Sequence, residues 1–183
     1  MNYAAIKNCD IANGPGVRVS LFVSGCTHHC KGCFNAVAWD FHYGEPFTAE
    51  TEDLLLEMLA PSYVKGITLL GGEPFEPENQ GALLNFLIKM KEKYPKKTVW
   101  AYSGYLFETQ ILSGELGDWD ITEQLIQLVD VLVDGPFMEE KKDLMLRFRG
   151  SSNQRIIDVK KSLMSNSVVL WEDWQGDERR KRL

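Results

Sequence analysis

Residues 17–33 read VRVSLFVSGCTHHCKGC, a hydrophobic run that ends at a glycine and leads directly into a loop with three cysteines. β-branched and aromatic residues fill much of 17–23, which is typical of a strand. Three thiolates spaced Cys-x3-Cys-x2-Cys can bind three irons of a cubic [4Fe-4S] cluster. The fourth iron of such a cube stays open, whereas clusters that only transfer electrons normally have every iron bound by protein. We therefore expect Cys26, Cys30 and Cys33 to form the reactive centre of an enzyme.

A zinc site is the first alternative use of these cysteines. Two of them, together with His28 or His29, would supply the mixed sulfur and nitrogen ligands that zinc accepts. Zinc knots usually draw a second pair of ligands from farther along the chain, but no cysteine follows Cys33, and His42 is the only later histidine. The zinc site is therefore disfavoured, and we expect His28 and His29 to face solvent.

Disulfide and dithiol chemistry are weaker alternatives. A chain of 183 residues with 4 cysteines does not need disulfides for its stability. A redox dithiol would use Cys30 and Cys33 and leave Cys26 without a role. Cys9 stands apart in the sequence, and we expect it to be a spare, partly buried thiol, not a fourth ligand.

Length and composition predict one domain over residues 1–183, with a C-terminal extension from about 160 to 183. The hydrophobic fraction of 44% and the charged fraction of 25% are ordinary for a globular protein. A net charge of −6 disfavours a nucleic-acid surface, which would be basic. The basic run at 179–182 is expected to be a solvated terminus. With no secretory segment and no long apolar run, the sequence predicts a cytoplasmic protein whose thiols stay reduced and which makes no membrane contact.

Strand and helix signals alternate along the chain. Thr48 is a plausible N-cap with Glu50 and Glu52 in the first helical turn, and Pro61 and Pro95 end the two helices that precede them. The predicted strands are 17–23, 66–70, 98–102, 129–133 and 155–159, with a possible sixth at 168–171. The predicted helices begin at 48 and at about 79, and two more cover 120–127 and 139–146.

This alternation predicts an α/β fold with parallel strands and outer helices. With so few strands, we expect an incomplete, laterally open (β/α) barrel. In such folds the carboxyl ends of the strands lie on one face, where sites are built. The cysteine loop, the Gly71-Gly72-Glu73-Pro74 turn, Ser103 and Asp134 each follow a predicted strand, so we expect them to converge.

Several further segments carry a family resemblance. They are DIANGPG at 10–16, SGC at 24–26, CKGCFN at 30–35, GGEP at 71–74, DGPF at 134–137 and RFRGSSNQ at 147–154. With these motifs the chain resembles the radical S-adenosylmethionine (SAM) superfamily, and within it the activators of anaerobic ribonucleoside-triphosphate reductases. Gly32, before the third cysteine, is similar to the reductase activators and unlike the pyruvate formate-lyase activators, where an aromatic residue is common. The residues after Val159 run longer than the resemblance predicts.

The resemblance implies roles for the cysteine loop and the Gly-Gly-Glu-Pro turn. The three cysteines would hold a [4Fe-4S] cluster whose fourth iron is chelated by SAM. Gly71 and Gly72 would let the backbone approach SAM, Glu73 would accept hydrogen bonds from its ammonium group, and Pro74 would stiffen the turn. An ordinary strand-to-helix turn is the alternative.

Other site residues carry two interpretations each. Gly32 and Phe34 would meet the adenine, although Phe34 could instead be a core residue. Ser103 would bind the SAM carboxylate or ribose, or cap its own turn. Asp134 would bind a ribose hydroxyl or cap a helix. Segment 147–154 would serve partner docking or the SAM carboxylate, and Arg18 is expected to be structural.

The implied activity is that of an activating enzyme. It would cleave SAM to a 5′-deoxyadenosyl radical and generate a glycyl radical on the large subunit of an anaerobic ribonucleoside-triphosphate reductase, with a flavodoxin-like electron donor. The open alternatives are activation of another glycyl-radical enzyme such as pyruvate formate-lyase, or a small-molecule radical SAM reaction. Two more come from other classes: a non-catalytic iron–sulfur electron carrier and a zinc-structured interaction module.

Overall fold

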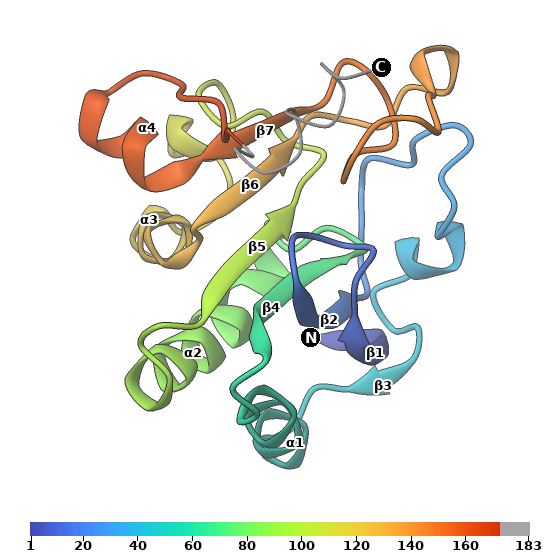
Figure 1. The fold of residues 1–183 in the computed structure, drawn as a ribbon. Helices are drawn as coiled ribbons and strands as arrows, with labels where there is room; N and C mark the ends of the chain where they lie inside the picture. Colours follow the sequence, from blue (N-terminus) through green and yellow to red (C-terminus); the bar gives the residue numbers. More distant parts are fainter. Residues whose placement is uncertain (173–183) are drawn as a thin grey trace, which may run out of the picture.

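A single mixed sheet organises the computed structural model, which describes residues 1–172 (Figure 1). Within these residues the sheet has seven strands in the order β3-β1-β2-β4-β5-β6-β7. Their bounds are Asn2–Asp10 (β1), Val17–Val23 (β2), Glu45–Pro46 (β3), Val64–Gly71 (β4), Thr98–Tyr102 (β5), Val131–Asp134 (β6) and Arg155–Asp158 (β7). The sheet is open, with β3 and β7 at its two edges. The predicted α/β class is confirmed.

Parallel pairing is confined to the centre of the sheet, where β2, β4, β5 and β6 run side by side. The predicted parallel arrangement is confirmed for these central strands, whereas β1 and β7 are antiparallel to their neighbours β2 and β6. A parallel neighbour needs a crossover that returns the chain to the other end of the sheet. The connection 135–154 has only a short 3-10 helix, Glu139–Lys141, so the chain enters β7 from the end where β6 stopped.

The helices are α1 (Ala49–Leu59), α2 (Pro77–Lys93), α3 (Trp119–Leu128) and α4 (Val159–Ser165), with further 3-10 helices at Ala36–Trp39 and Ile111–Ser113. The N-cap at Thr48 is confirmed, and Thr51 completes a capping box with it. The predicted helix at 139–146 is reduced to the 3-10 turn, and the predicted strand at 168–171 to one bridge between Ile157 and Leu170. Strands β1 and β3 and helix α4 were not predicted.

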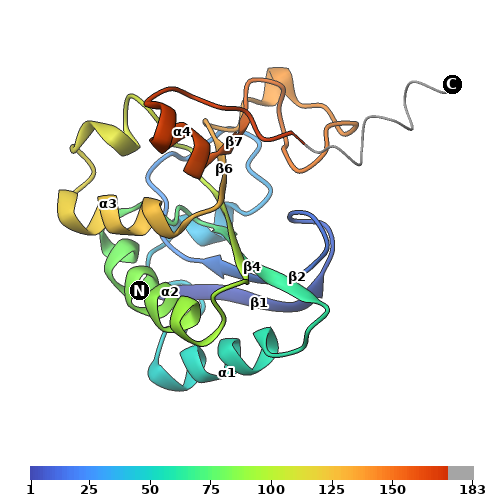
Figure 2. The ribbon, with the colours of Figure 1, turned by 60° about the vertical axis from the view of Figure 1, so that its left-hand side comes forward.

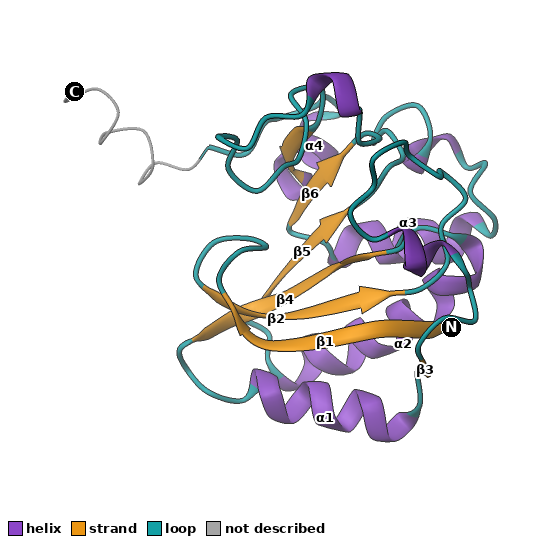
Figure 3. Ribbon diagram, turned by 90° about the vertical axis from the view of Figure 1, so that its right-hand side faces the viewer, coloured by secondary structure: helices purple, strands orange, loops and turns teal. Residues whose placement is uncertain are grey.

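The two faces of the sheet differ in chemistry. Helices α1 and α2 cover one face (Figure 3), against which Val19, Leu21 and Val23 of β2 are completely buried. The alternate residue Arg18 is also buried, and its guanidinium donates to Thr68 Oγ1 at 2.8 Å and to the backbone oxygens of Ile67 and Thr98. Arg18 therefore ties β2 to β4 and β5, as expected of a structural residue.

The helices of the described residues include no candidate membrane span, since none is both long and apolar enough. In the turned view of Figure 2 the segment after α4 runs back past β7 toward the loop between β6 and β7. The basic run at 179–182, predicted as a solvated terminus, lies outside the described residues.

Candidate functional site

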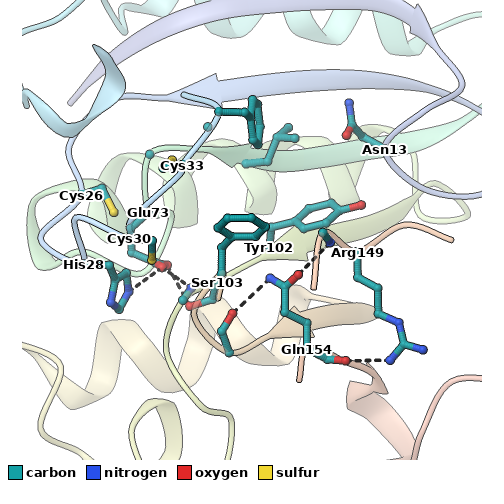
Figure 4. Close-up of a pocket in the computed structure, with 18 of the residues that line it drawn as sticks. Asn13, Cys26, His28, Cys30, Cys33, Glu73, Tyr102, Ser103, Arg149 and Gln154 are labelled. Carbon is teal, nitrogen blue, oxygen red and sulfur yellow. Dashed lines mark hydrogen bonds and ion pairs between the residues drawn. The ribbon is translucent and has the colours of Figure 1, made fainter. Parts of the chain in front are cut away.

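A pocket of about 360 Å³ lies at the carboxyl ends of the parallel strands. This volume is within the range of small-molecule sites. Its walls come from five connections: the β1–β2 loop with Asn13, the loop after β2, the turn after β4, the turn after β5 and the long loop between β6 and β7 (Figure 4). The predicted site residues that line it are Cys26, Cys30, Cys33, Phe34, Gly71, Gly72, Glu73 and Ser103. The expected convergence of strand-end loops is thus present in the structure.

The cysteine loop is anchored by backbone hydrogen bonds to the 3-10 helix Ala36–Trp39. The Gly25 amide donates to Ala38 O at 2.9 Å, and the Cys26 amide to Trp39 O at 3.2 Å. Gly25 has φ +92°, and a Cβ there would lie 2.2 Å from the Phe41 ring, so a glycine is needed where β2 becomes the loop. All three cysteines are free thiols.

Burial raises the pKa of the Cys26 thiol to about 12. The backbone amides of His28 and His29 donate hydrogen bonds to this sulfur and act in the opposite direction. Amide hydrogen bonds to a cysteine sulfur are one of the ways in which a protein adjusts an iron–sulfur cluster. The loop therefore presents a sulfur that a bound cation would deprotonate and that the backbone is already arranged to stabilise.

Among residues 1–172, no three His, Cys, Asp or Glu side chains form a group that could hold a single metal ion. A zinc ion needs its ligands to meet at one point, ~2.3 Å from each sulfur. Each cysteine of a cubic cluster binds its own iron, so three sulfurs around one pocket without a common centre fit a cluster better than they fit zinc.

The Gly-Gly-Glu-Pro turn packs directly against the base of the cysteine loop. The Gly72 amide donates to Val23 O at 2.7 Å, and the Glu73 amide to Gly25 O at 2.8 Å. A Cβ on Gly72 would lie 2.5 Å from Gly25 O. The second glycine is therefore required by the contact between the two loops, in addition to any ligand that approaches it.

Glu73 lies at the floor of the pocket with only 1% of its surface exposed. Its Oε1 accepts from the Phe75 amide at 2.8 Å and from Ser103 Oγ at 2.9 Å. Its Oε2 accepts from the Gly104 amide at 2.6 Å and faces His28 Nε2 at 3.0 Å. Both oxygens thus have protein donors, and an incoming ammonium group would have to share them.

Of the two roles expected for Ser103, the structure contains the turn cap. Its hydroxyl donates to Glu73 and accepts from the Tyr105 amide at 3.0 Å, which caps the turn after β5. It also lines the pocket, where 5% of its surface is exposed and its single hydroxyl hydrogen is donated to Glu73.

Phe34 and Gly32 follow different patterns. Phe34 lines the pocket but is 85% exposed, so core packing is excluded as its role. Gly32 has φ +76°, and a Cβ there would lie 3.0 Å from Glu139 Oε1. A left-handed backbone next to a side chain explains the glycine at this position.

Asp134 and Pro74 are buried and do not line the pocket. The Asp134 carboxylate accepts from the Phe107 amide at 3.0 Å and forms an ion pair with Arg155. Asp134 therefore connects β6 to β7 and to the loop after β5. The next residue, Gly135, lines the pocket.

The expectations for the environments of His28 and Cys9 are wrong. His28 does not face solvent: its side chain is 17% exposed and contacts Glu73. Burial alone would lower the pKa of His28, but the hydrogen bond to Glu73 and the charge of Glu76 raise it. Cys9 is exposed, not partly buried, and its residue lies in a left-handed conformation with φ +56°.

Tyr102 lines the pocket without having been predicted as a site residue, and Phe148 lines it from the predicted segment 147–154. Tyr102 is the last residue of β5, and that position at the carboxyl end of a parallel strand was the available signal. Gln154 anchors the 147–154 segment there: its Oε1 accepts from the Gly150 amide at 2.8 Å, and its Nε2 donates to Gly135 O at 3.1 Å.

Comparison with known proteins adds a family to this geometry. A family model described as "4Fe-4S single cluster domain" matches residues 12–157. An "Anaerobic ribonucleoside-triphosphate reductase-activating protein" of Enterobacteria phage T4 is 38% identical over 173 residues, which cover 94% of this chain and 99% of the relative. Proteins of the same name from Pasteurella multocida and Escherichia coli K12 are 41% and 39% identical, over 85% and 84% of this chain and 96% of each relative.

Proposed function

The chain belongs to the family of anaerobic ribonucleoside-triphosphate reductase-activating proteins, and we propose that it generates the glycyl radical of such a reductase with a SAM-dependent [4Fe-4S] centre. The observation that carries the proposal is that Cys26, Cys30 and Cys33 line the same pocket as the Gly71–Glu73 turn and Ser103. When bound, the cluster would supply the single electron that cleaves the SAM sulfonium to methionine and a 5′-deoxyadenosyl radical. The radical would take a hydrogen atom from the glycine Cα, giving 5′-deoxyadenosine and the glycyl radical.

The chain's own residues would hold and orient the reactants. Cys26, Cys30 and Cys33 would each bind one iron, and the amides that face Cys26 would stabilise its thiolate. Gly71 and Gly72 would allow SAM to approach the backbone next to the cysteine loop. Exposed Phe34 would cover the adenine from outside, with Gly32 giving the loop its turn.

Glu73 and Ser103 would face the polar groups of SAM from the pocket floor, Glu73 toward the ammonium and Ser103 toward the carboxylate or ribose. Pro74 would stiffen the turn from its buried position. Asp134 would act indirectly, because its ion pair with Arg155 supports the strand end from which Gly135 enters the pocket.

The open sheet is interpreted as the incomplete (β/α) barrel of the radical SAM type, formed by one domain over the whole chain. An open side suits a protein loop as substrate, and the partner would be the large catalytic subunit of the reductase. A flavodoxin-like protein would supply electrons in a reducing cytoplasm, where the cysteines remain free thiols.

The test uses anaerobically purified full-length protein. We expect about four irons and four sulfides per chain for one cubic cluster, formation of 5′-deoxyadenosine when SAM and a reductant are added, and a glycyl-radical EPR signal on the cognate reductase. Cys26→Ala, Cys30→Ala and Cys33→Ala should each abolish all three results.

Three outcomes would contradict the proposal. Stoichiometric zinc would indicate an interaction module, and a stable cluster without SAM cleavage an electron carrier. SAM cleavage with a radical on pyruvate formate-lyase but none on the reductase would identify another target. Replacing the chemical reductant by reduced flavodoxin tests the donor.

A further inference from the structure

Two of the three residues between the first two cysteines, Thr27 and His28, contact acidic groups in and directly after the Gly-Gly-Glu-Pro turn. His28 Nε2 lies 3.0 Å from Glu73 Oε2, and because a carboxylate oxygen only accepts hydrogen bonds, His28 is the donor. The His28 ring also contacts the Tyr105 ring, with centroids 4.3 Å apart. A side chain enclosed in this way connects the cysteine loop to the turns after β4 and β5.

Gly104 provides the space for the imidazole. A Cβ on Gly104 would lie 2.5 Å from His28 Cδ2, so any larger residue would displace the ring. The Gly104 amide donates to the same Oε2 of Glu73 at 2.6 Å. His28, Gly104 and Glu73 therefore form one contact group from three separate connections. Figure 4 shows the His28 ring beside Glu73.

Thr27 makes a second, parallel connection. Its amide and its hydroxyl both donate to Glu76 Oε1, at 2.7 and 2.6 Å. Glu76 is 3% exposed and occupies the N-cap of α2, a position that favours Ser, Thr, Asp or Asn. Within the described residues its carboxylate makes no capping bond and turns to the cysteine loop instead.

We infer that Thr27 and His28 are positioning residues, which hold the cysteine loop against Glu76 and Glu73 and so set its place relative to the Gly-Gly-Glu-Pro turn before any cluster is bound. The inference rests on the proposed function for its consequence, because the same Glu73 carboxylate also receives Ser103 and Gly104 beside the expected SAM site. A loop that is already ordered in the folded chain loses less conformational entropy when the cluster and SAM bind, so binding is stronger.

The central comparison is His28→Leu with His28→Gln. Glutamine keeps an N–H that can reach Glu73, whereas leucine fills similar space without a donor. The first measurement is hydrogen–deuterium exchange of the amides in residues 26–33 of the metal-free full-length chain. We expect the leucine variant to exchange about 10-fold faster or more, because a charged hydrogen bond is lost, and the glutamine variant to remain close to the wild type.

The second measurement is SAM affinity of the reconstituted holoenzyme, read from the change that SAM causes in the EPR spectrum of the reduced cluster. His28→Leu should weaken SAM binding by about 10-fold, at equal iron content, and His28→Gln should restore it. Thr27→Val and Thr27→Ser form a second pair with the same expected order. His42→Leu is the matched control, since the His42 side chain is 95% exposed.

Two results would overturn the inference. Wild-type exchange and affinity in His28→Leu would show that the contact positions nothing, and equal damage in both His28 variants would assign the effect to the ring against Tyr105. Failure of the proposed function is distinguishable, since the wild type would then not cleave SAM while the exchange measurement on metal-free protein would still order the variants.

Discussion

Glu73 and Asp130 carry carboxylates at opposite ends of the parallel part of the sheet, Glu73 after β4 and Asp130 before β6. The two carboxylates are held by different kinds of partner. Asp130 precedes β6, accepts from the Val99 amide at 2.7 Å, and pairs with Lys91 of α2 and Lys160 of α4. Glu73 follows β4 and is held by two amides, a hydroxyl and an imidazole. The ammonium groups of Lys91 and Lys160 offset the charge of Asp130. Glu73 instead lines the same pocket as the three thiols of the cysteine loop.

The comparison teaches that the charge of the partners distinguishes a supporting carboxylate from one at the site, since Asp130, 15% exposed, is paired with lysines and Glu73, 1% exposed, is not. Both carboxylates organise loops, but Asp130 joins helices to the sheet through opposite charges, which is an arrangement for stability. Glu73 joins the loops that carry the cysteines and the glycines. Within residues 1–172, no lysine or arginine donates a hydrogen bond to its carboxylate. Substitution of Glu73 should therefore lower the affinity for SAM, whereas substitution of Asp130 should lower the free energy of unfolding.

Glu73→Gln should have the largest effect on the site. Each oxygen of Glu73 now accepts hydrogen bonds from protein donors. The NH₂ group of glutamine would replace one of these oxygens and face donors in its place, and an unsatisfied buried donor costs ~1–3 kcal/mol. We expect SAM affinity to fall by about 10-fold or more, with iron content partly retained, as measured by equilibrium binding to the reconstituted protein. Unchanged affinity would remove Glu73 from the site.

Gly72→Ala should damage the cysteine loop as well as the SAM site. The added methyl would lie 2.5 Å from Gly25 O and 3.0 Å from Ala38 O, and both are backbone atoms. We expect lower iron content and weaker SAM binding together. Gly81→Ala is the control, because a Cβ there meets nothing within 4 Å, and its position inside α2 predicts a gain of about 0.5–1 kcal/mol in stability. Normal iron content in Gly72→Ala would show that the loop adjusts.

Asp130→Asn should lower stability and leave the pocket intact. Burial opposes ionisation of Asp130, but Lys160, the Val99 amide and Lys91 outweigh it and hold its pKa below the ordinary value of 3.8. We expect a loss of about 1.5–3 kcal/mol in the free energy of unfolding at neutral pH, because hydrogen bonds to a charged group are lost, with iron content and SAM affinity unchanged. Asp53→Asn, on an exposed position of α1, should have no effect.

The same position predicts a pH dependence. Because the folded-state pKa of Asp130 is lower than the unfolded value, its contribution is complete above 3.8 and is lost as the pH falls through the folded-state pKa. Denaturant unfolding at a series of acidic pH values should show a smaller loss for Asp130→Asn than for the wild type. Parallel curves for the two proteins would contradict the assigned ion pairs.

Cys9→Ala should have the smallest effect. Cys9 is exposed, and its sulfur lies 3.6 Å from Asn8 Oδ1 and 3.9 Å from Tyr63 Oη. It does not line the pocket that the other three cysteines line. Iron content, SAM cleavage and stability should match those of the wild type. Loss of iron would show that the ligand count of three is wrong.

The local features of this protein were readable from the order of its residues. The cysteine spacing, the glycines at 71 and 72 and the strands at 17–23 and 98–102 each depend on neighbours in the chain, and strand 98–102 matches β5 residue for residue. The N-cap at Thr48 was found for the same reason. Hydrophobic runs and turn residues report their own conformation because the relevant forces act within a few residues.

The long-range features came from the fold. The direction of β7, the pairing of Asp134 with Arg155 and the enclosure of His28 by Glu73 join residues 21 to 45 positions apart. Neither a propensity nor a motif records such contacts, because they form only when the whole sheet brings distant loops together. The chemistry of the metal centre is therefore local, and its environment is a property of the packed molecule.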